Sequence, residues 1–290
     1  MEAKRIEAEK AAEIRKKTSL ILLSAVVATI AVFLVITKII IPNNKYNAAI
    51  ELMESGNIIE AYESLVALGD YKDSAEKAES ISEQYRTEKL KTAQVGDYVY
   101  FGSYEQNNNT SDGAEEIEWL VLDKQDDKIL VVSKYGLDAK PYNKEYVGIT
   151  WEKCTLRSWL NDDFYNAAFN VYEKKAIIQT TVSPGYTSHP ENDTVDNVFL
   201  LSINEANRYF SSDSVRKCVS TDYAIAQGAD KSYKYKVGGN YSCWWWLRSP
   251  GDNQRRAAYV YFDGSVYLSG HDVGDDGVCV RPALWINLYS

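Results

Sequence analysis

The chain has 290 residues, 45% of them hydrophobic, and a formal net charge of −9, which suits one sizeable domain with attachments. The acidic balance argues against binding to a nucleic-acid backbone, which requires clustered Lys and Arg. Only two histidines are present, and the four cysteines form no Cys-x-x-Cys pair. These counts exclude a three-histidine metal site and argue against a zinc knuckle or a disulfide framework.

The first 42 residues predict a charged tail, residues 1–17, followed by a membrane anchor, residues 18–42. Leu20 to Ile36 carries no charge, and about 20 apolar residues span a bilayer core. Lys and Arg are more frequent before this run than after it, so the positive-inside rule places the N-terminus in the cytoplasm and the remainder outside. A cleaved signal peptide and a buried helix of a soluble protein are the alternatives. No small-x-small cleavage site follows the run, which favours an uncleaved anchor.

Residues 43–92 predict short helices, because Ala, Leu and Tyr recur at helical spacing. Gly56 and Gly69 stand where helix C-caps belong. The pattern resembles one tetratricopeptide-like helical pair, and a single unit is too small for a solenoid. We therefore interpret this segment as a spacer or a small interaction module.

From Val95 onward the pattern becomes that of β-structure. IEWLVLD and KILVVSKY, separated by a polar turn, predict a hairpin. The stretch 155–178 predicts one or two helices, and residues 197–210 predict a strand followed by a helix. Together with a C-terminal third of short strands, these elements indicate an α+β domain over residues 93–290.

Asp263-Gly264 predicts a tight turn between two C-terminal strands. Because side chains alternate along a strand, one face of this hairpin is expected to be apolar and the other rich in tyrosine. The apolar set consists of Ala258, Val260, Phe262, Val266 and Leu268. The tyrosine set consists of Tyr259, Tyr261 and Tyr267.

Several stretches in fixed order carry a family resemblance. They are GDYVYFGSYEQ, IEWLVL, ITWEKCTLRSWLNDDFYNAAF, TVDNVFLLSINEA, TDYAIAQGA, CWWWLRSPG and VRPALWI. They resemble a family of uncharacterised bacterial domains with a C-type-lectin-like fold, distantly related to formylglycine-generating enzymes. The resemblance implies that residues 93–290 form such a domain on a surface protein. Some members are variable targets of diversity-generating retroelements, whose C-terminal segment is rewritten at adenines. The family has Gly before Val-Arg-Pro where this chain has Cys279, which puts the shape of that loop in question.

The resemblance divides the C-terminal segment into scaffold and variable-type positions. The scaffold set includes Trp244, Trp245, Trp246, Arg248 and Arg281. The predicted ligand-binding residues are Asn253, Tyr259, Tyr261, Tyr267, His271, Asp272, Asp275 and Asp276. Arginines within apolar stretches pair with buried carboxylates or carbonyls, and the candidate partners are Asp97, Glu118 and Asp196.

No catalytic or metal-binding constellation stands out from the residues. Cys243 and Cys279 invite comparison with the cysteine pair of formylglycine-generating enzymes, but nothing near them in sequence lowers a thiol pKa, so buried thiols are the preferred interpretation. The acidic loop around His271 and the loop 189–197 match no EF-hand spacing. We therefore expect no metal, no cofactor and no catalytic residues.

The sequence predicts a single-pass membrane protein with a cytoplasmic N-terminus and an extracellular recognition domain. Its expected partners are the bilayer, through residues 18–42, and an extracellular protein or glycan. An enzyme on a formylglycine-generating-enzyme-like fold and a structural or sensory membrane subunit are the alternatives.

Overall fold

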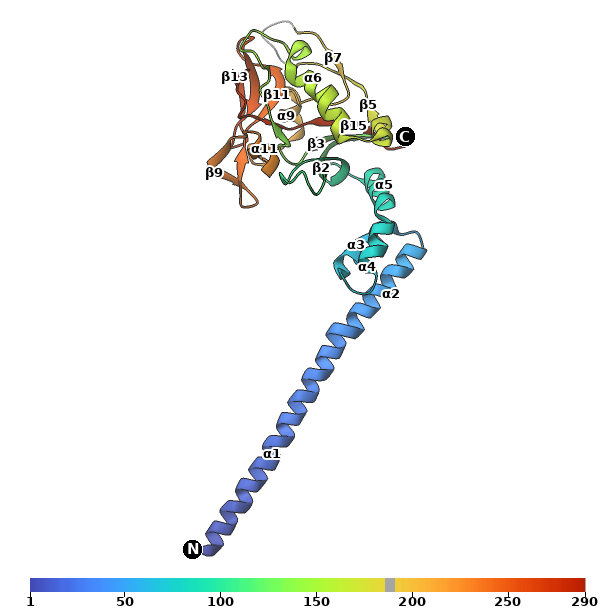
Figure 1. Cartoon of the computed structure of the whole chain (residues 1–290), viewed down its shortest axis with the longest axis vertical. Coiled ribbons are helices and arrows are strands. Elements are labelled where there is room, and N and C mark those ends of the chain that lie inside the picture. The colour runs from blue at the N-terminus through green and yellow to red at the C-terminus, as the bar shows by residue number, and fades with distance from the viewer. Residues whose placement is uncertain (186–190, 290) are drawn as a thin grey trace. The chain divides into compact units, whose positions relative to one another are not determined.

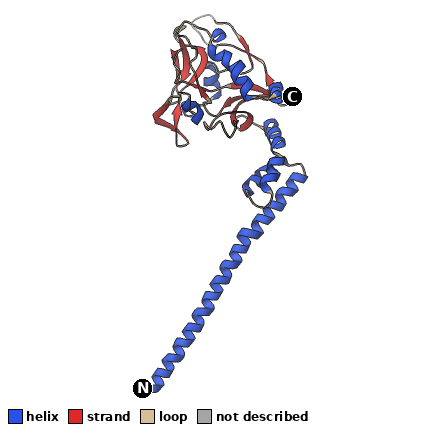
Figure 2. Cartoon of the chain, in the orientation of Figure 1, coloured by secondary structure: helices blue, strands red, loops and turns tan. Residues whose placement is uncertain are grey.

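The computed structural model describes residues 1–185 and 191–289, which divide into two compact units, Met1–Glu88 and Lys89–Ser290. Figures 1 and 2 show that the strands belong to the second unit, whereas the first contains helices. The two units are described separately below.

The N-terminal unit begins with a long helix. Helix α1 (Glu2–Val35) continues through the π-helical turn η1 (Ile36–Ile40) into α2 (Ile41–Glu54). Pro42 follows directly after η1, where the hydrogen-bond pattern of the helix already departs from that of a regular α-helix. By length and composition the part from Glu13 to Glu54 qualifies as one membrane span, a criterion that a signal sequence also meets.

Three shorter helices complete this unit and enclose a small core. They are α3 (Ile58–Leu68), α4 (Ser74–Ser80) and α5 (Ser82–Thr92). Gly56 and Gly69 have φ of +81° and +55° and end α2 and α3, as the sequence predicts. The buried residues of this core are Ala49, Ala61, Leu65, Ala78 and Ile81. Three of the five are alanines, whose small side chains let helices approach closely.

The C-terminal unit is α+β, with two five-stranded sheets. The first has the order β1 (Tyr98–Tyr104), β2 (Glu115–Gln125), β3 (Lys128–Ser133), β15 (Ala283–Asn287) and β5 (Ile177–Ile178). The second has the order β13 (Val266–Asp272), β12 (Arg256–Val260), β11 (Trp245–Pro250), β14 (Cys279–Val280) and β4 (Asp138–Ala139). All pairings in both sheets are antiparallel except that of β11 with β14.

Smaller elements surround these sheets. A three-stranded sheet contains β8 (Cys218–Val219), β10 (Asn240–Cys243) and β9 (Lys231–Val237), and β6 (Thr180–Val182) pairs with β7 (Thr194–Asp196). The helices and helical turns are η2 (Trp151–Lys153), α6 (Thr155–Trp159), η3 (Leu160–Phe164), α7 (Tyr165–Ala168), α8 (Val171–Ala176), α9 (Ile203–Tyr209), α10 (Asp213–Arg216) and α11 (Asp222–Ala226). The predicted hairpin is β2–β3, and the predicted helical region 155–178 contains two helical segments separated near Phe169. The strand expected before α9 is reduced to a single bridge between Phe199 and Ala283.

Buried arginines tie distant segments of this unit together, but not to the predicted partners. Arg248 donates to both carboxylate oxygens of Glu205, at 2.6 and 2.8 Å, and to two carbonyls. Arg281 donates to the carbonyl oxygens of Ser133 and Arg216 at 2.9 and 3.2 Å. The sequence-based choices were therefore wrong, because Glu118 pairs with Lys134 and Asp196 pairs with Arg157.

The C-terminal hairpin β12–β13 departs from simple alternation. Ala257 pairs with His271 and Tyr259 with Tyr267, so between these pairs the single residue Ala258 of β12 faces three residues of β13, 268–270. The extra residues bulge outward, and Leu268 is consequently 57% exposed rather than in the core. Phe262 also leaves the predicted apolar face, because β12 ends at Val260 and residue 262 belongs to the turn.

Candidate functional site

Six aromatic side chains of the C-terminal sheet gather into one cluster, which we call the aromatic hairpin face. Its members are Trp244, Tyr259, Tyr261, Phe262, Tyr267 and His271. Directly opposite residues of neighbouring antiparallel strands share a face, and Tyr259 lies opposite both Trp246 on β11 and Tyr267 on β13. The register therefore brings tryptophans and tyrosines together on the same side of the sheet.

Trp244 is the centre of this cluster. Its ring centroid lies 5.5 Å from that of Tyr259, 5.6 Å from that of Phe262 and 4.7 Å from that of His271. Its indole Nε1 donates to the carbonyl oxygen of Gly277 at 3.0 Å, which fixes the orientation of the ring. These centroid distances fall within the range in which aromatic pairs attract one another. Trp244 is only 8% exposed, so it supports the more exposed rings of the cluster from below.

The three tyrosines differ in exposure. Tyr267 is 40% exposed and Tyr261 is half-buried, whereas Tyr259 is only 7% exposed. Burial, followed by the neighbouring Tyr267 and Tyr261, raises the pKa of Tyr259 to about 12. The expectation that all three tyrosines present their rings to a ligand was therefore wrong for Tyr259. That ring supports the face from below, against the stacked ring of Tyr267 at 5.2 Å.

Carboxylates border the His271 side of the face. His271 Nε2 lies 2.7 Å from Asp275 Oδ2, and Asp275 Oδ1 accepts from the backbone N–H of Gly277 at 2.9 Å. Burial and the charges of Asp275 and Asp276 raise the pKa of Asp230, which approaches Gly277 from the segment before β9. This border thus offers hydrogen-bond acceptors beside the aromatic rings.

The two remaining predicted residues have other contacts. Asp272 lies 3.5 Å from both the Tyr146 hydroxyl and Arg256 Nε. Asn253 is exposed, and its side chain bonds to Asp252 and to the N–H of Arg255, within its own turn. Among residues 1–185 and 191–289 no group of three or more His, Cys, Asp or Glu side chains is arranged to hold a metal ion. His189 and Pro190 of the loop 189–197 lie outside the described residues.

The two cysteines considered as a catalytic pair are buried. Cys243 and Cys279 are both 0% exposed, and burial raises the pKa of Cys243 well above its ordinary value. Cys243 lies opposite Cys218 in the β8–β10 pair, so the inaccessible thiols adjoin one another. Cys279 stands where the resemblance predicts a glycine, and it fits there because Gly136 faces it. A Cβ on Gly136 would lie 2.8 Å from Cys279 Cβ and 2.9 Å from its sulfur.

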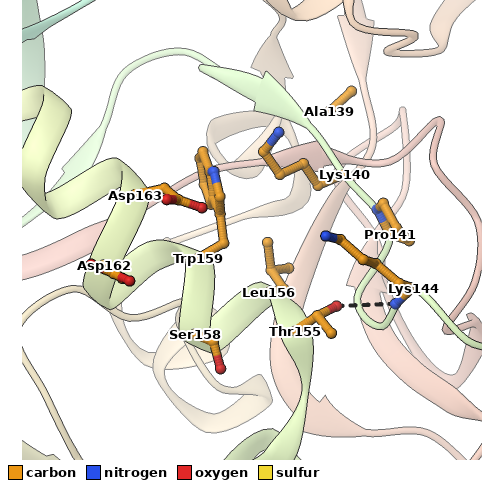
Figure 3. Close-up of a pocket in the computed structure, with 10 residues that line it drawn as sticks. All are labelled: Ala139, Lys140, Pro141, Lys144, Thr155, Leu156, Ser158, Trp159, Asp162 and Asp163. Carbon is orange, nitrogen blue, oxygen red and sulfur yellow. Dashed lines mark hydrogen bonds between the residues drawn. The ribbon is translucent and has the colours of Figure 1, made fainter.

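A pocket of about 550 Å³ lies between the segment 139–144 and the helical region 155–163. Figure 3 shows Lys140 and Lys144 on one side of it and Trp159 and Asp163 on the other. The Lys140 amine lies 4.7 Å from the centroid of the Trp159 ring, and Thr155 accepts from the Lys144 N–H at 3.0 Å. Its lysines are matched by Asp162 and Asp163, so the lining has no dominant sign of charge. Sequence reasoning missed this pocket, because its two walls are separate segments that only the fold brings together.

Comparisons with known proteins identify one family. Residues 126–288, more than half of the chain, match the family model described as Domain of unknown function (DUF6273). No curated protein and no solved structure matches, and the comparisons identify no enzyme family. The chain therefore belongs to the DUF6273 family of domains of unknown function.

Proposed function

We propose that this protein is a membrane-anchored recognition protein of the cell surface, and that its aromatic hairpin face binds a glycan. The observation that carries the proposal is the coexistence of half-exposed rings, Tyr261 and Tyr267, with a carboxylate border. Aromatic faces stack on the apolar sides of sugar rings, and carboxylates accept hydrogen bonds from sugar hydroxyls. A protein epitope is the second ligand class, since Tyr-rich surfaces also form protein interfaces.

The proposed anchor is the apolar part of the helix Glu13–Glu54. Large side chains along it, such as Leu22, Val27 and Phe33, are 58–64% exposed, a pattern that suits contact with lipid. The excess of Lys and Arg before the apolar run supports a cytoplasmic N-terminus. Helices α3 to α5 then provide the proposed tetratricopeptide-like spacer between membrane and recognition domain.

The C-type-lectin-like fold and retroelement diversification belong to the same proposal. The support for diversification is that Asn253, Tyr267 and Asp276, three of the predicted ligand-binding residues, are exposed. The genomic DNA beside the gene tests this part of the proposal. We expect a near-copy of the 3′ coding segment that differs from it only opposite adenines and lies next to a reverse transcriptase gene. The absence of such a copy contradicts diversification.

The binding proposal is tested with the double variant Tyr261→Ala/Tyr267→Ala. The full chain, reconstituted in lipid nanodiscs, is applied to an array of immobilised bacterial cell-wall glycans. We expect binding to at least one glycan, weakened in the double variant by roughly tenfold or more, since stacked rings dominate such contacts. Tyr259 is left intact because it is buried and its removal would disturb the fold.

Tyr172→Ala and Tyr233→Ala provide the matched controls. Both tyrosines are exposed, at 77% and 92%, and neither belongs to the face. Glycan binding that the controls reduce as much as the double variant does would exclude the face as the site. Capture of a protein instead of any glycan, lost in the double variant, would move the ligand to the second class.

A further inference from the structure

A second pocket in the C-terminal unit differs from the first in the sign of its charge. It has a volume of about 470 Å³ and lies among the start of β1, the segment around α10, and the ends of β8 and β9. Its lining includes three cationic side chains, Lys134, Lys217 and Arg281, and no Asp or Glu. The pocket therefore carries positive charge although the whole chain has a net charge of −9. It shares no residue with the aromatic hairpin face.

Arg281 contributes a buried, incompletely used guanidinium to this pocket. The side chain is 3% exposed and its guanidinium carbon lies 4.9 Å from the ring centroid of Trp245 and 5.3 Å from that of Phe210. Nε and Nη1 donate to carbonyl oxygens, while Nη2 has no partner in the described part of the chain. Within residues 1–185 and 191–289 no carboxylate lies within 4.0 Å of Arg281 or Lys217. A buried cation without an ionic partner is costly, and an anionic ligand would supply the missing charge.

The other two cations of the pocket, Lys134 and Lys217, are half-buried. Lys134 pairs with Glu118 at 2.6 Å, and Glu118 does not line the pocket. The Lys217 amine lies 5.8 Å from the centroid of the Tyr235 ring. Asp263 is near enough to Lys217 for their charges to interact, but it too is outside the lining. Lys234 and Lys236 on β9 are exposed and add positive charge beside Val237, which reaches the pocket.

Apolar and aromatic groups make up most of the remaining wall. They include Tyr98, Leu120, Tyr209, Phe210, Val215 and Val237. Tyr98 is 47% exposed and Val215 is 51% exposed, so part of this wall faces the solvent. Apolar walls with a few convergent polar groups are typical of small-molecule sites. A hydrophilic ion such as phosphate would leave this surface unused.

We infer that this pocket binds a carboxylate carried on an apolar or aromatic body, with Arg281 and Lys217 contacting the carboxylate. The planar guanidinium matches a carboxylate in geometry, and Lys217 adds a point charge. The rings of Tyr98 and Phe210 and the neighbouring valines enclose the body of the ligand. This ligand is of a different chemical class from the glycan proposed for the aromatic hairpin face.

The test uses isothermal titration calorimetry on the full chain in nanodiscs, with empty nanodiscs as the blank. The probes are 4-phenylbutyrate, its uncharged analogue 4-phenylbutyramide, and inorganic phosphate. We expect the carboxylate to bind at least about tenfold more tightly than the amide, because hydrogen bonds to charged groups are the stronger ones. Phosphate is expected to bind more weakly than 4-phenylbutyrate.

Lys217→Gln is expected to weaken 4-phenylbutyrate binding by roughly fivefold and to leave the amide unaffected. Lys175→Gln is the matched control, because that lysine also lies above a tyrosine ring, at 5.7 Å from Tyr172, but is not in the pocket. Tyr98→Ala reports on the aromatic wall, and no Arg281 variant is used because Arg281 also donates to two carbonyl oxygens that fix the fold. The inference is overturned if 4-phenylbutyrate does not bind detectably, if it binds no more tightly than 4-phenylbutyramide, or if phosphate binds more tightly than it does. Equal effects of Lys217→Gln and Lys175→Gln on its binding would overturn the inference as well.

Discussion

At the residue scale, the absence of a side chain at one glycine permits the conformation and the packing of the β12–β13 turn. Gly264 in the β12–β13 turn has φ of +90°, a region that other residues rarely adopt. A Cβ on it would lie 1.7 Å from the carbonyl oxygen of Asp213 on α10. The Asp-Gly turn is therefore required both by its own conformation and by the helix packed against it.

Gly264→Ala is expected to destabilise the protein by about 3 kcal/mol or more, because strain at positive φ adds to a steric clash. Gly238→Ala provides the control: φ there is +56°, but no atom lies within 4 Å of the added Cβ. That change should cost only about 1 kcal/mol. Urea unfolding followed by tryptophan fluorescence measures both, and similar costs at the two sites would contradict the role of Asp213.

At the element scale, two short helices begin with the same kind of capping box, but the glutamates of the two boxes have different additional partners. In α8 the box joins Asn170 and Glu173, and in α9 it joins Ser202 and Glu205. Glu173 additionally accepts from the N–H of Gly102, whereas Glu205 neutralises the buried guanidinium of Arg248. Arg248 in turn bonds to carbonyls before β7 and α9. The start of α9 therefore fixes β11, which supports the aromatic hairpin face.

Glu205→Ala should thus destabilise the protein more than Glu173→Ala does. Each loses a capping interaction of about 1 kcal/mol, but only the first leaves a buried arginine without its counter-ion, which costs about 2 kcal/mol or more in addition. The free energies of unfolding of both variants give the comparison. Equal values would mean that the Arg248–Glu205 pair contributes no more than the Gly102–Glu173 hydrogen bond that Glu173→Ala also removes.

At the scale of the whole molecule, the proposed topology separates a charged tail from the C-terminal unit. The four native cysteines are all buried and free, so the unmodified protein should not react with a membrane-impermeant maleimide. Exposed positions on the two sides of the proposed span are Glu7 and Tyr172. Thiols introduced there can report separately on each side.

In intact cells we expect Tyr172→Cys to be labelled and Glu7→Cys to be labelled only after lysis. The expectation follows from the proposed topology, in which the apolar run crosses the bilayer with its positive flank inside. Labelling of Glu7→Cys in intact cells would reverse the orientation. Recovery of a shortened chain in the soluble fraction would show a cleaved signal sequence instead.

The sequence alone determined those features that depend on neighbours along the chain. The apolar helix, the helix ends at Gly56 and Gly69, the β2–β3 hairpin and the Asp263-Gly264 turn follow from local periodicity and turn chemistry. These signals are local because hydrogen-bond patterns in helices and turns join residues a few positions apart. The ordered motifs of the C-terminal segment likewise pointed to a domain of unknown function.

Only the tertiary structure decided the contacts between distant segments. Arg248 and Glu205 are 43 residues apart, and Arg281 and Ser133 are 148 apart, so spacing could not pair them. Strict alternation along the strands predicted that Leu268 is in the core and that Tyr259 is on the exposed face. The bulge in β13 instead exposes Leu268, and packing under Tyr267 buries Tyr259. Both pockets join walls from separate segments. Their charge and shape are properties of the packed chain, because burial and long-range pairing are set by how the sheets close on one another.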